Sequence, residues 1–150
     1  MYVYCSCGHK HWGRYGAAGL LVTDPARTGV VLQKRGTMTH HGGTWALAGG
    51  AIERGESPAE AALREAHEEE RLDPGSVAVV RTFTGTVHPE WTYTYVLAET
   101  PRPADPVLSR GLTWESDGAR WVDVGDVPAL PLHPSLRTDW PWLVGELTAD

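Results

Sequence analysis

The sequence predicts one α/β domain, and two observations lead to that prediction. Short runs rich in β-branched and aromatic residues, typical of strands, lie on both sides of one long helical segment. A second helical pattern begins at Pro134 and places apolar residues on one face. At 150 residues the chain can bury an ordinary core, and no linker composition interrupts it. We therefore expect a single domain over residues 1–150, with residues 1–14 as an N-terminal segment.

The expected elements follow in chain order. We expect strands at residues 15–23, 29–35, 45–47, 76–83, 91–98 and 121–124, with a proline-rich loop at 101–110. A short turn or helix is expected at residues 126–130. The C-terminal helix should bury one face that carries Leu136, Trp140, Leu143 and Leu147.

The long helix has the strongest start signal in the chain. Ser57 is a favoured N-cap, Pro58 suits the first helical position, and Glu60 completes a capping box. Ahead of it we expect Gly49-Gly50 to form a turn. A helix end at Arg71 would place a non-glycine residue in the left-handed conformation, at a cost of about 1 kcal/mol. We therefore expect the helix to run on and stop before Pro74.

The faces of this helix differ in chemistry. The helical period places Ala59, Ala62, Leu63 and Ala66 on one apolar stripe. It places Glu65, Glu68 and Glu69 on an acidic arc, which Ala61 leaves open and which Arg64 flanks. Like charges on one helix face repel by roughly 0.2–0.5 kcal/mol per pair in solvent. Such an arc is either a solvated surface or the site of a hard divalent cation, which prefers oxygen ligands.

The spacing around this arc resembles a known motif. Gly50, five residues, Glu56, seven residues and then Arg64-Glu65-Ala66-His67-Glu68-Glu69-Glu70-Arg71-Leu72 is similar to the Nudix box. The chain departs from that pattern at Arg71, where the family usually has glycine, and at Ala66, which is small for an aliphatic position. The resemblance implies a Nudix-type α/β/α sandwich with a mixed β-sheet, in which the box forms a catalytic loop-helix-loop.

The resemblance also implies a reaction, the hydrolysis of a phosphoanhydride in a nucleoside diphosphate derivative. The substrate is polyanionic, so the reaction is expected to need Mg²⁺ or Mn²⁺. The implied ligands are Glu68 and Glu69, with Glu65 sharing the cluster and the carbonyl of Gly49 completing it. Arg64 is expected to hold these glutamates by charge-assisted hydrogen bonds, and Glu56 to orient the loop.

The general base is left open. Glu65 is the candidate inside the box, and His88, Glu90 and Glu115 are candidates outside it. In some Nudix enzymes a glutamate before a late strand adds a metal ligand, and Glu115 matches that place. The alternative for Glu115 is an ordinary loop acid.

Candidate substrate-binding residues lie outside the box. Lys34 and Arg35 end a predicted strand. They are either an ordinary polar strand end or, as the resemblance implies, basic residues that meet substrate phosphate. Trp91 and Tyr93 would share a strand face with Tyr95, either as sheet packing or as a platform for a nucleotide base. His88 lies just ahead of that strand and could face the site. The polar loop 36–44 is a candidate lid.

Composition restricts the partners. A net charge of −6 argues against general nucleic-acid binding, and no apolar run is long enough to span a membrane. The N-terminus lacks a signal-peptide pattern, and the closely spaced Cys5 and Cys7 fit a reducing cytoplasm. The group Cys5, Cys7, His9 and His11 could bind zinc, although its spacing favours an ordinary segment. The family resemblance makes a homodimer possible.

The resemblance implies an Mg²⁺-dependent pyrophosphohydrolase. The aromatic strand and the small single domain favour, as its reaction, the conversion of oxidised or surplus nucleoside triphosphates to monophosphates. A second hypothesis is hydrolysis of ADP-ribose or a nucleotide sugar by the same chemistry. A third is a non-catalytic sensor that binds a nucleotide without cleaving it.

Overall fold

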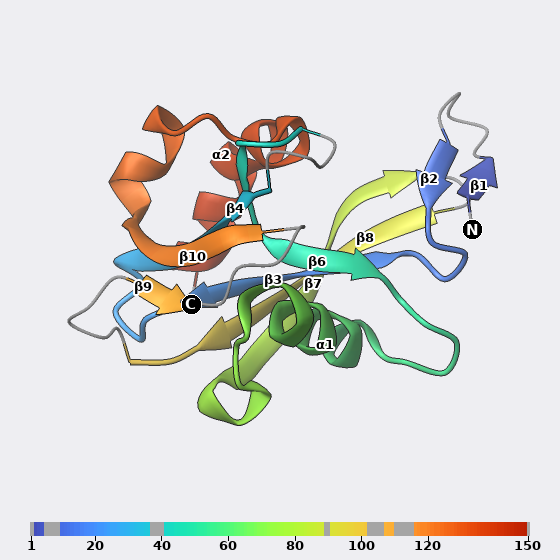
Figure 1. The fold of residues 1–150 in the computed structure, drawn as a ribbon, viewed down its shortest axis with the longest axis horizontal. Coiled ribbons are helices and arrows are strands. Elements are labelled where there is room, and N and C mark those ends of the chain that lie inside the picture. The colour runs from blue at the N-terminus through green and yellow to red at the C-terminus, as the bar shows by residue number, and fades with distance from the viewer. Residues whose placement is uncertain are drawn as a thin grey trace.

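In the computed structural model, a mixed β-sheet lies between two helices, α1 (Pro58–Glu70) and α2 (Pro134–Thr148) (Figure 1). The structure describes residues 2–4, 10–36, 41–88, 91–101, 107–109 and 116–149. The strands of the sheet are β3 (Ala17–Thr23), β4 (Gly29–Arg35), β5 (Trp45–Ala46), β6 (Ala48–Ala51), β7 (Ala78–His88), β8 (Trp91–Glu99), β9 (Val107–Ser109) and β10 (Ser116–Asp123). Two 3₁₀ turns, Pro74–Ser76 and Val124–Ala129, follow α1 and β10.

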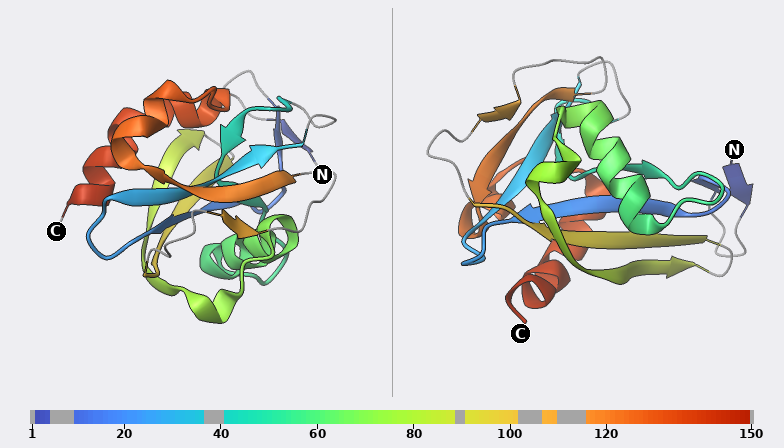
Figure 2. Two further views of the ribbon diagram at one scale, coloured as in Figure 1. Left: turned by 60° about the vertical axis from the view of Figure 1, so that its left-hand side comes forward. Right: turned by 90° about the horizontal axis from the view of Figure 1, so that it is seen from below.

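The order of strands makes the sheet mixed. The main path runs β7-β8-β3-β4-β10-β9, and β3 and β8 are parallel neighbours, whereas the other pairs are antiparallel. The helices cover opposite faces of this sheet (Figure 2). The predicted α/β class and the predicted sandwich with a mixed sheet are therefore confirmed.

The centre of the sheet opens between β3 and β4. These strands pair at Thr23 and Val30. Further along, β3 pairs with β6, whereas β4 pairs with β5. The short segment formed by β5 and β6 thus lies between β3 and β4 where these two strands diverge. The acidic residues of α1 reach this opening, since Glu69 contacts Gln33 of β4 and Gly49 of β6.

Each helix covers its own hydrophobic core. The cluster beneath α1 includes Leu20, Val96 and Trp121, and the cluster beneath α2 includes Leu21 and Leu97. The predicted apolar face of α2, which consists of Leu136, Trp140, Leu143 and Leu147, is buried as expected. The predicted stripe of α1 also faces its core.

Ala61 corrects one detail of the α1 prediction. It does not leave the acidic arc open, because it is fully buried in the core beneath the helix. The buried face of α1 is therefore wider than the sequence pattern suggested.

The predicted continuation of α1 beyond Arg71 is wrong. The helix ends at Glu70, and Arg71 adopts the left-handed conformation with φ of 60°. The N–H of Leu72 donates to the carbonyl of Ala66 at 3.4 Å, and the Leu72 side chain is buried in the core beneath α1. Burying a leucine contributes roughly 1.5–3 kcal/mol, which exceeds the roughly 1–2 kcal/mol cost of a left-handed residue.

The predicted Gly49-Gly50 turn is also wrong, since both glycines lie in strand β6. They pair with Gly19 and Ala18 of β3. A Cβ at Gly49 would lie 2.5 Å from the carbonyl oxygen of Ala18 and 2.9 Å from the Cα of Gly19. The glycine is needed for close approach of two backbones, and not for a turn.

Other differences concern the ends of the chain and its loops. Strand β7 extends to His88, and the expected loop 101–110 contains the short strand β9. In the N-terminal segment, β1 (Tyr2–Tyr4) and β2 (Lys10–Trp12) pair as a separate two-stranded sheet. Cys5, Cys7 and His9 lie outside the described residues, and His11 is described only as part of β2. Among the described residues, neither helix has the length and apolarity to cross a membrane.

Candidate active site

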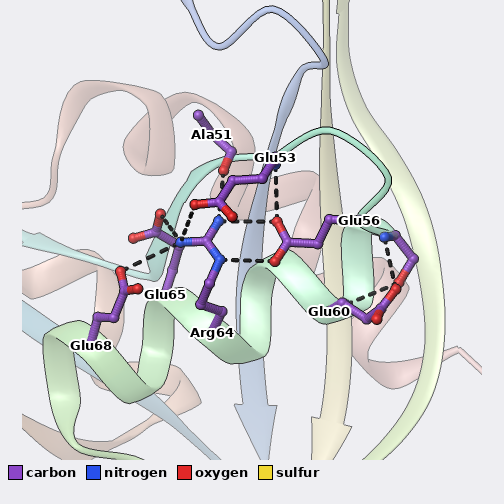
Figure 3. A network of polar contacts seen from close by, with 8 residues as sticks. Ala51, Glu53, Glu56, Glu60, Arg64, Glu65 and Glu68 are labelled. Atoms are coloured by element: carbon purple, nitrogen blue, oxygen red, sulfur yellow. Dashed lines mark hydrogen bonds and ion pairs between the residues drawn. The ribbon is translucent and has the colours of Figure 1, made fainter.

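Arg64 is the centre of a network of acidic side chains on the exposed side of α1 (Figure 3). Its Nε and Nη2 donate to the two carboxylate oxygens of Glu56 at 2.8 and 3.0 Å. Its Nη1 donates to Glu65 at 3.1 Å and to Glu68 at 3.5 Å, and Nη2 also reaches the carbonyl of Ala51 at 3.0 Å. One guanidinium thus joins the helix to strand β6 and to the loop between them. Its pair with Glu56 is bidentate and charge-assisted, which makes it stronger than a hydrogen bond between neutral groups.

This network fixes the loop between β6 and α1. The Glu56 carboxylate also accepts the backbone N–H of Glu53 at 3.0 Å. The reciprocal bonds between Ser57 and Glu60 form the predicted capping box. The hydrogen bond from Arg64 holds the pKa of Glu56 below its usual value, and these contacts together raise the pKa of Arg64. Both groups are charged at neutral pH, so the loop is held by a permanent ion pair.

Glu69 lies on the buried side of the arc, with 7% of its surface exposed. Its Oε2 accepts from Gln33 Nε2 at 2.9 Å and from the backbone N–H of Gly49 at 3.3 Å. Burial raises the pKa of Glu69 to about 8, and the nearby carboxylates of Glu65 and Glu70 add to that rise. Bringing a cation to this carboxylate would offset both causes.

Glu65 lies between Arg64 and the strand. A Cβ at Gly50 would lie 2.6 Å from the Glu65 carboxyl carbon, so the carboxylate covers the Gly50 backbone. Glu68, in contrast, has 54% of its side chain exposed. The three acids therefore form a series from the core to the solvent.

The arrangement does not bring three metal-ligating side chains together. Within the described part of the chain, no group of three or more His, Cys, Asp or Glu residues is placed to hold a metal ion. The contacts account for this, because Glu65 and Glu68 turn to Arg64 while Glu69 turns to Gln33. The donors themselves are carboxylates and a backbone segment, which is the oxygen chemistry that Mg²⁺ prefers.

A pocket of about 700 Å³ adjoins the box at Gly49 and Gly50. Its residues come from β4 to β6, from β8 and from the start of α2. They are Arg35, Ala46, Leu47, Gly49, Gly50, Trp91, Tyr93, Tyr95, His133, Pro134, Ser135, Leu136, Thr138 and Asp139. The volume lies in the range of small-ligand sites, which are lined mainly by apolar and aromatic groups.

Aromatic side chains of β8 form one wall of this pocket. Trp91, Tyr93 and Tyr95 all line it, which confirms that they share a face. Tyr95 is buried, and its hydroxyl donates to Asp139 of α2 at 2.5 Å. Trp91 and Tyr93 are half-buried, and burial together with the charge of Glu69 raises the pKa of Tyr93. The Tyr93 ring thus connects the pocket with the acidic side of the box.

The other predicted site residues fall in different places. Arg35 lines the pocket, whereas Lys34 is not among the lining residues. His88 ends β7, but its side chain lies outside the described part of the structure. Glu90 and Glu115 lie outside the described residues, so their expected roles stay predictions.

Sequence reasoning missed two residues of this region, Gln33 and Asp139. Gln33 occupies a buried position of a strand that otherwise carries aliphatic residues there. A polar residue at a strand position where the alternation predicts a buried aliphatic residue is the signal that could have identified Gln33. Asp139 had no comparable signal, because only the packing of α2 brings it to Tyr95.

Comparison with known proteins decides the family. The sequence model of the NUDIX domain matches residues 13–143. The chain belongs to the Nudix hydrolase family. Residues 50–72, which comprise the loop before α1 and the helix itself, therefore form a Nudix box, despite arginine in place of glycine at position 71.

Two relatives illustrate the similarity in sequence. The chain is 40% identical over 151 residues to a "Nucleoside triphosphate pyrophosphatase/Nudix hydrolase fusion protein" of Bifidobacterium longum, covering 97% of this chain and 31% of that protein. It is 41% identical over 147 residues to "Putative 8-oxo-dGTP diphosphatase 3" of Mycobacterium tuberculosis, covering 93% of this chain and 66% of that one. The chain thus spans less than two thirds of the length of either relative.

A solved structure supports the same family. The crystal structure of the Nudix hydrolase RenU from M. smegmatis superposes with a TM-score of 0.83 at 35% identity. The match covers 97% of this chain and 94% of that one. The structural similarity to this hydrolase therefore covers nearly the whole chain.

Proposed function

We propose that this Nudix protein hydrolyses a phosphoanhydride bond in nucleoside diphosphate-linked substrates. The preferred substrates are oxidised nucleoside triphosphates, which would give a monophosphate and pyrophosphate. The observation that carries the proposal is the shared border at Gly49 and Gly50. One side of this backbone segment contacts Glu65 and Glu69, and the same segment lines an aromatic pocket.

A divalent cation fits the acidic side of that border. Glu69 is buried beside other carboxylates, and a buried carbonyl oxygen of Gln33 has no hydrogen-bond partner among the described residues. Both features are unfavourable without a cation or its bound water. We propose that Glu65, Glu68, Glu69 and the carbonyl of Gly49 hold Mg²⁺ or Mn²⁺. Glu68 is exposed enough to turn from Arg64 toward it at little cost.

The residues of the chain have separate tasks in this proposal. A bound cation would neutralise phosphate oxygens and lower the pKa of a coordinated water. Arg64 keeps Glu56 and Glu65 in place, and Glu65 is the proposed acceptor of the proton from the attacking water. Arg35, with Lys34, would bind phosphate oxygens. His88, Glu90 and Glu115 remain alternative proton acceptors.

The pocket is the proposed site of the base. Trp91 and Tyr93 offer flat surfaces for stacking, which contributes about 1–3 kcal/mol per base in comparable sites. The name of the Mycobacterium tuberculosis relative specifies 8-oxo-dGTP, and this supports an oxidised purine as the first substrate to try. The negatively charged chain has no evident attraction for nucleic acid, so we propose a free nucleotide in the cytoplasm.

A substrate panel tests the proposal. The intact protein is incubated with 8-oxo-dGTP, the ordinary nucleoside triphosphates, ADP-ribose and nucleotide sugars, with Mg²⁺ or with EDTA. We expect a nucleoside triphosphate to yield pyrophosphate and a monophosphate when Mg²⁺ is present, and no product when EDTA is present. Release of AMP and ribose phosphate instead would favour the ADP-ribose hypothesis. Tight nucleotide binding without turnover of any compound would favour a sensor and overturn the catalytic proposal.

A further inference from the structure

Gln33 occupies a special place in the divided sheet. It lies on β4 with 2% of its surface exposed, and its Nε2 donates to Glu69 Oε2 at 2.9 Å. The same carboxylate oxygen accepts from the backbone of Gly49, on β6. Since β4 and β6 lie on the two sides of the opening between β3 and β4, Glu69 is held from both sides at once.

The other end of the Gln33 amide has an unmet requirement. Its Oε1 is buried and has no hydrogen-bond partner among the described residues. Buried polar atoms in folded proteins are nearly always hydrogen-bonded, so an exception points to a missing donor. The oxygen shares one carbon with the nitrogen that binds Glu69, so it lies at the edge of the acidic cluster. A carboxylate that binds a cation is ionised, so in the cation-bound site the neighbouring glutamates accept hydrogen bonds and cannot supply the missing donor.

The water around a divalent cation is a donor of the right kind. Mg²⁺ loses its water reluctantly and keeps several molecules when carboxylates bind it. Water bound to a cation donates strongly to a neutral acceptor. A carbonyl oxygen beside a ligating carboxylate is therefore placed to receive such a bond, as residues behind metal ligands commonly do.

We propose that Gln33 is a positioning residue of the cation site. Its amide N–H fixes one oxygen of Glu69, and its amide oxygen accepts a hydrogen bond from the hydration shell of the bound cation. This inference rests on the proposed divalent cation and extends it to a residue outside the box. It requires Gln33 to contribute to cation affinity, and not only to packing beneath α1.

The first test measures Mn²⁺ binding to the intact protein without substrate, by electron paramagnetic resonance. Gln33→Met keeps the size of the side chain and removes both the donor and the acceptor. We expect its Mn²⁺ dissociation constant to rise by about 10–100-fold, the usual effect of losing a residue behind a metal ligand. The expected kinetic result is a lower apparent affinity for the cation at saturating substrate.

The matched control is Val31→Ala. Val31 lies two residues earlier on β4 and packs in the core beneath α1. This change should lower the melting temperature and leave the Mn²⁺ dissociation constant unchanged. If both variants weakened Mn²⁺ binding equally, loosening of the core would explain the result and Gln33 would have no special role.

The second test uses the unmodified sequence, so it does not depend on a variant folding. The protein is labelled with ¹³C and ¹⁵N, and the side-chain amide signals of Gln33 are followed by NMR while Mg²⁺ is added. We expect them to shift with the same midpoint as the carboxyl signals of Glu65 and Glu69. Shifts of the glutamates without any shift at Gln33 would overturn the inference.

The outcomes separate this inference from the proposed function. If the unmodified protein binds Mn²⁺ and Gln33→Met binds it equally well, the inference fails while the metal-dependent function stands. If the unmodified protein binds neither Mn²⁺ nor Mg²⁺, the cation site itself is wrong and both proposals fail.

Discussion

Arg64 shows how one side chain organises several like charges. It contacts Glu56, Glu65 and Glu68 and the carbonyl of Ala51, so it holds the helix, the loop and strand β6 together. A lysine has one point charge and cannot make the bidentate pair with Glu56. The position therefore requires arginine for geometric reasons, in addition to charge.

We expect Arg64→Lys to lower kcat/KM by about 10–100-fold, because the glutamates lose the side chain that orients them. Steady-state kinetics with the substrate found by the panel measure this. Arg81→Lys is the control, since Arg81 pairs with Glu146 at 3.1 Å far along the chain from the box. An equal loss of activity in both variants would contradict the role of Arg64.

Glu69 contrasts with Arg64, because its environment opposes its charge. Its pKa is about 8 in the folded protein, above the usual value of 4.5. As the pH rises from 4.5 to 8, the unfolded chain loses this proton while the folded chain keeps it. The folded state therefore becomes less stable over that range, and the loss is complete above pH 8.

Glu69→Gln removes this penalty and the proposed ligand together. In buffer with EDTA at pH 8, we expect the variant to be more stable than the unmodified protein by on the order of 3 kcal/mol. The difference should shrink toward pH 4.5, and turnover should fall by orders of magnitude. Urea unfolding across this pH range measures the first effect. Glu68→Gln, at an exposed side chain, should leave the pH dependence of stability in place.

At the scale of elements, the end of α1 shows a balance between backbone strain and burial. Arg71 is left-handed so that the chain can turn and bury Leu72. The family usually has glycine at this position, which adopts the conformation without strain. Arg71 thus adopts the same left-handed turn, but with the backbone strain that a non-glycine residue has in this conformation.

Arg71→Gly should therefore raise the free energy of unfolding by about 0.5–1 kcal/mol, because the strain disappears. Denaturant unfolding at neutral pH measures it. Gly55→Ala is a control of opposite sign, since Gly55 has φ of 81° and open space around it. A lower stability for Arg71→Gly would show that the arginine side chain contributes more than its backbone costs.

The two glycines of β6 serve different neighbours. A Cβ at Gly49 would meet the backbone of β3, which cannot move without breaking the pairing. A Cβ at Gly50 would meet the end of the Glu65 side chain, which can turn away. The same substitution should therefore have different results at the two positions.

We expect Gly49→Ala to lower stability by more than about 3 kcal/mol, as overpacking against rigid backbone does at its upper range. Gly50→Ala should keep most of the stability and lose Mn²⁺ affinity and activity, because Glu65 is displaced. Thermal unfolding and Mn²⁺ titration distinguish the two. Gly145→Ala in α2, where nothing lies within 4 Å, controls for the added methyl group. Full activity in Gly50→Ala would contradict the placement of Glu65.

At the scale of the molecule, the opening between β3 and β4 creates the site. The core beneath α1 and the core beneath α2 are separated by the sheet. The acidic side of α1 and the aromatic pocket meet at Gly49 and Gly50 of β6. The apolar residues buried in the two cores stabilise the domain, and this offsets the cost of the buried carboxyl group of Glu69 when no cation is bound.

Cation binding should therefore stabilise the whole domain in a pH-dependent way. A ligand carboxylate must be ionised, and Glu69 keeps its proton up to a pH of about 8. At a fixed Mg²⁺ concentration, the rise in melting temperature should be larger at pH 8.5 than at pH 6. Differential scanning calorimetry measures it. Glu69→Gln should remove most of this rise, whereas a rise that is independent of pH would exclude Glu69 as a ligand.

The sequence determined the helix that carries the box, since its capping residues, apolar stripe and acidic positions depend on neighbours in the chain. It also determined that Trp91 and Tyr93 face the same way, because strand alternation is local. It gave no reason to place Gln33 beside Glu69, or Asp139 beside Tyr95. Those pairs are separated by 36 and 44 residues.

Tertiary structure decided the backbone conformation at the positions where predictions from neighbouring residues were wrong. The left-handed Arg71 depends on a core that accepts Leu72, and the extended Gly49-Gly50 depends on β3 lying close enough to exclude a Cβ. Local patterns set which residues are charged, apolar or capped. Burial and close approach between distant segments set which of three similar glutamates is solvated, which is paired and which is left protonated in the core.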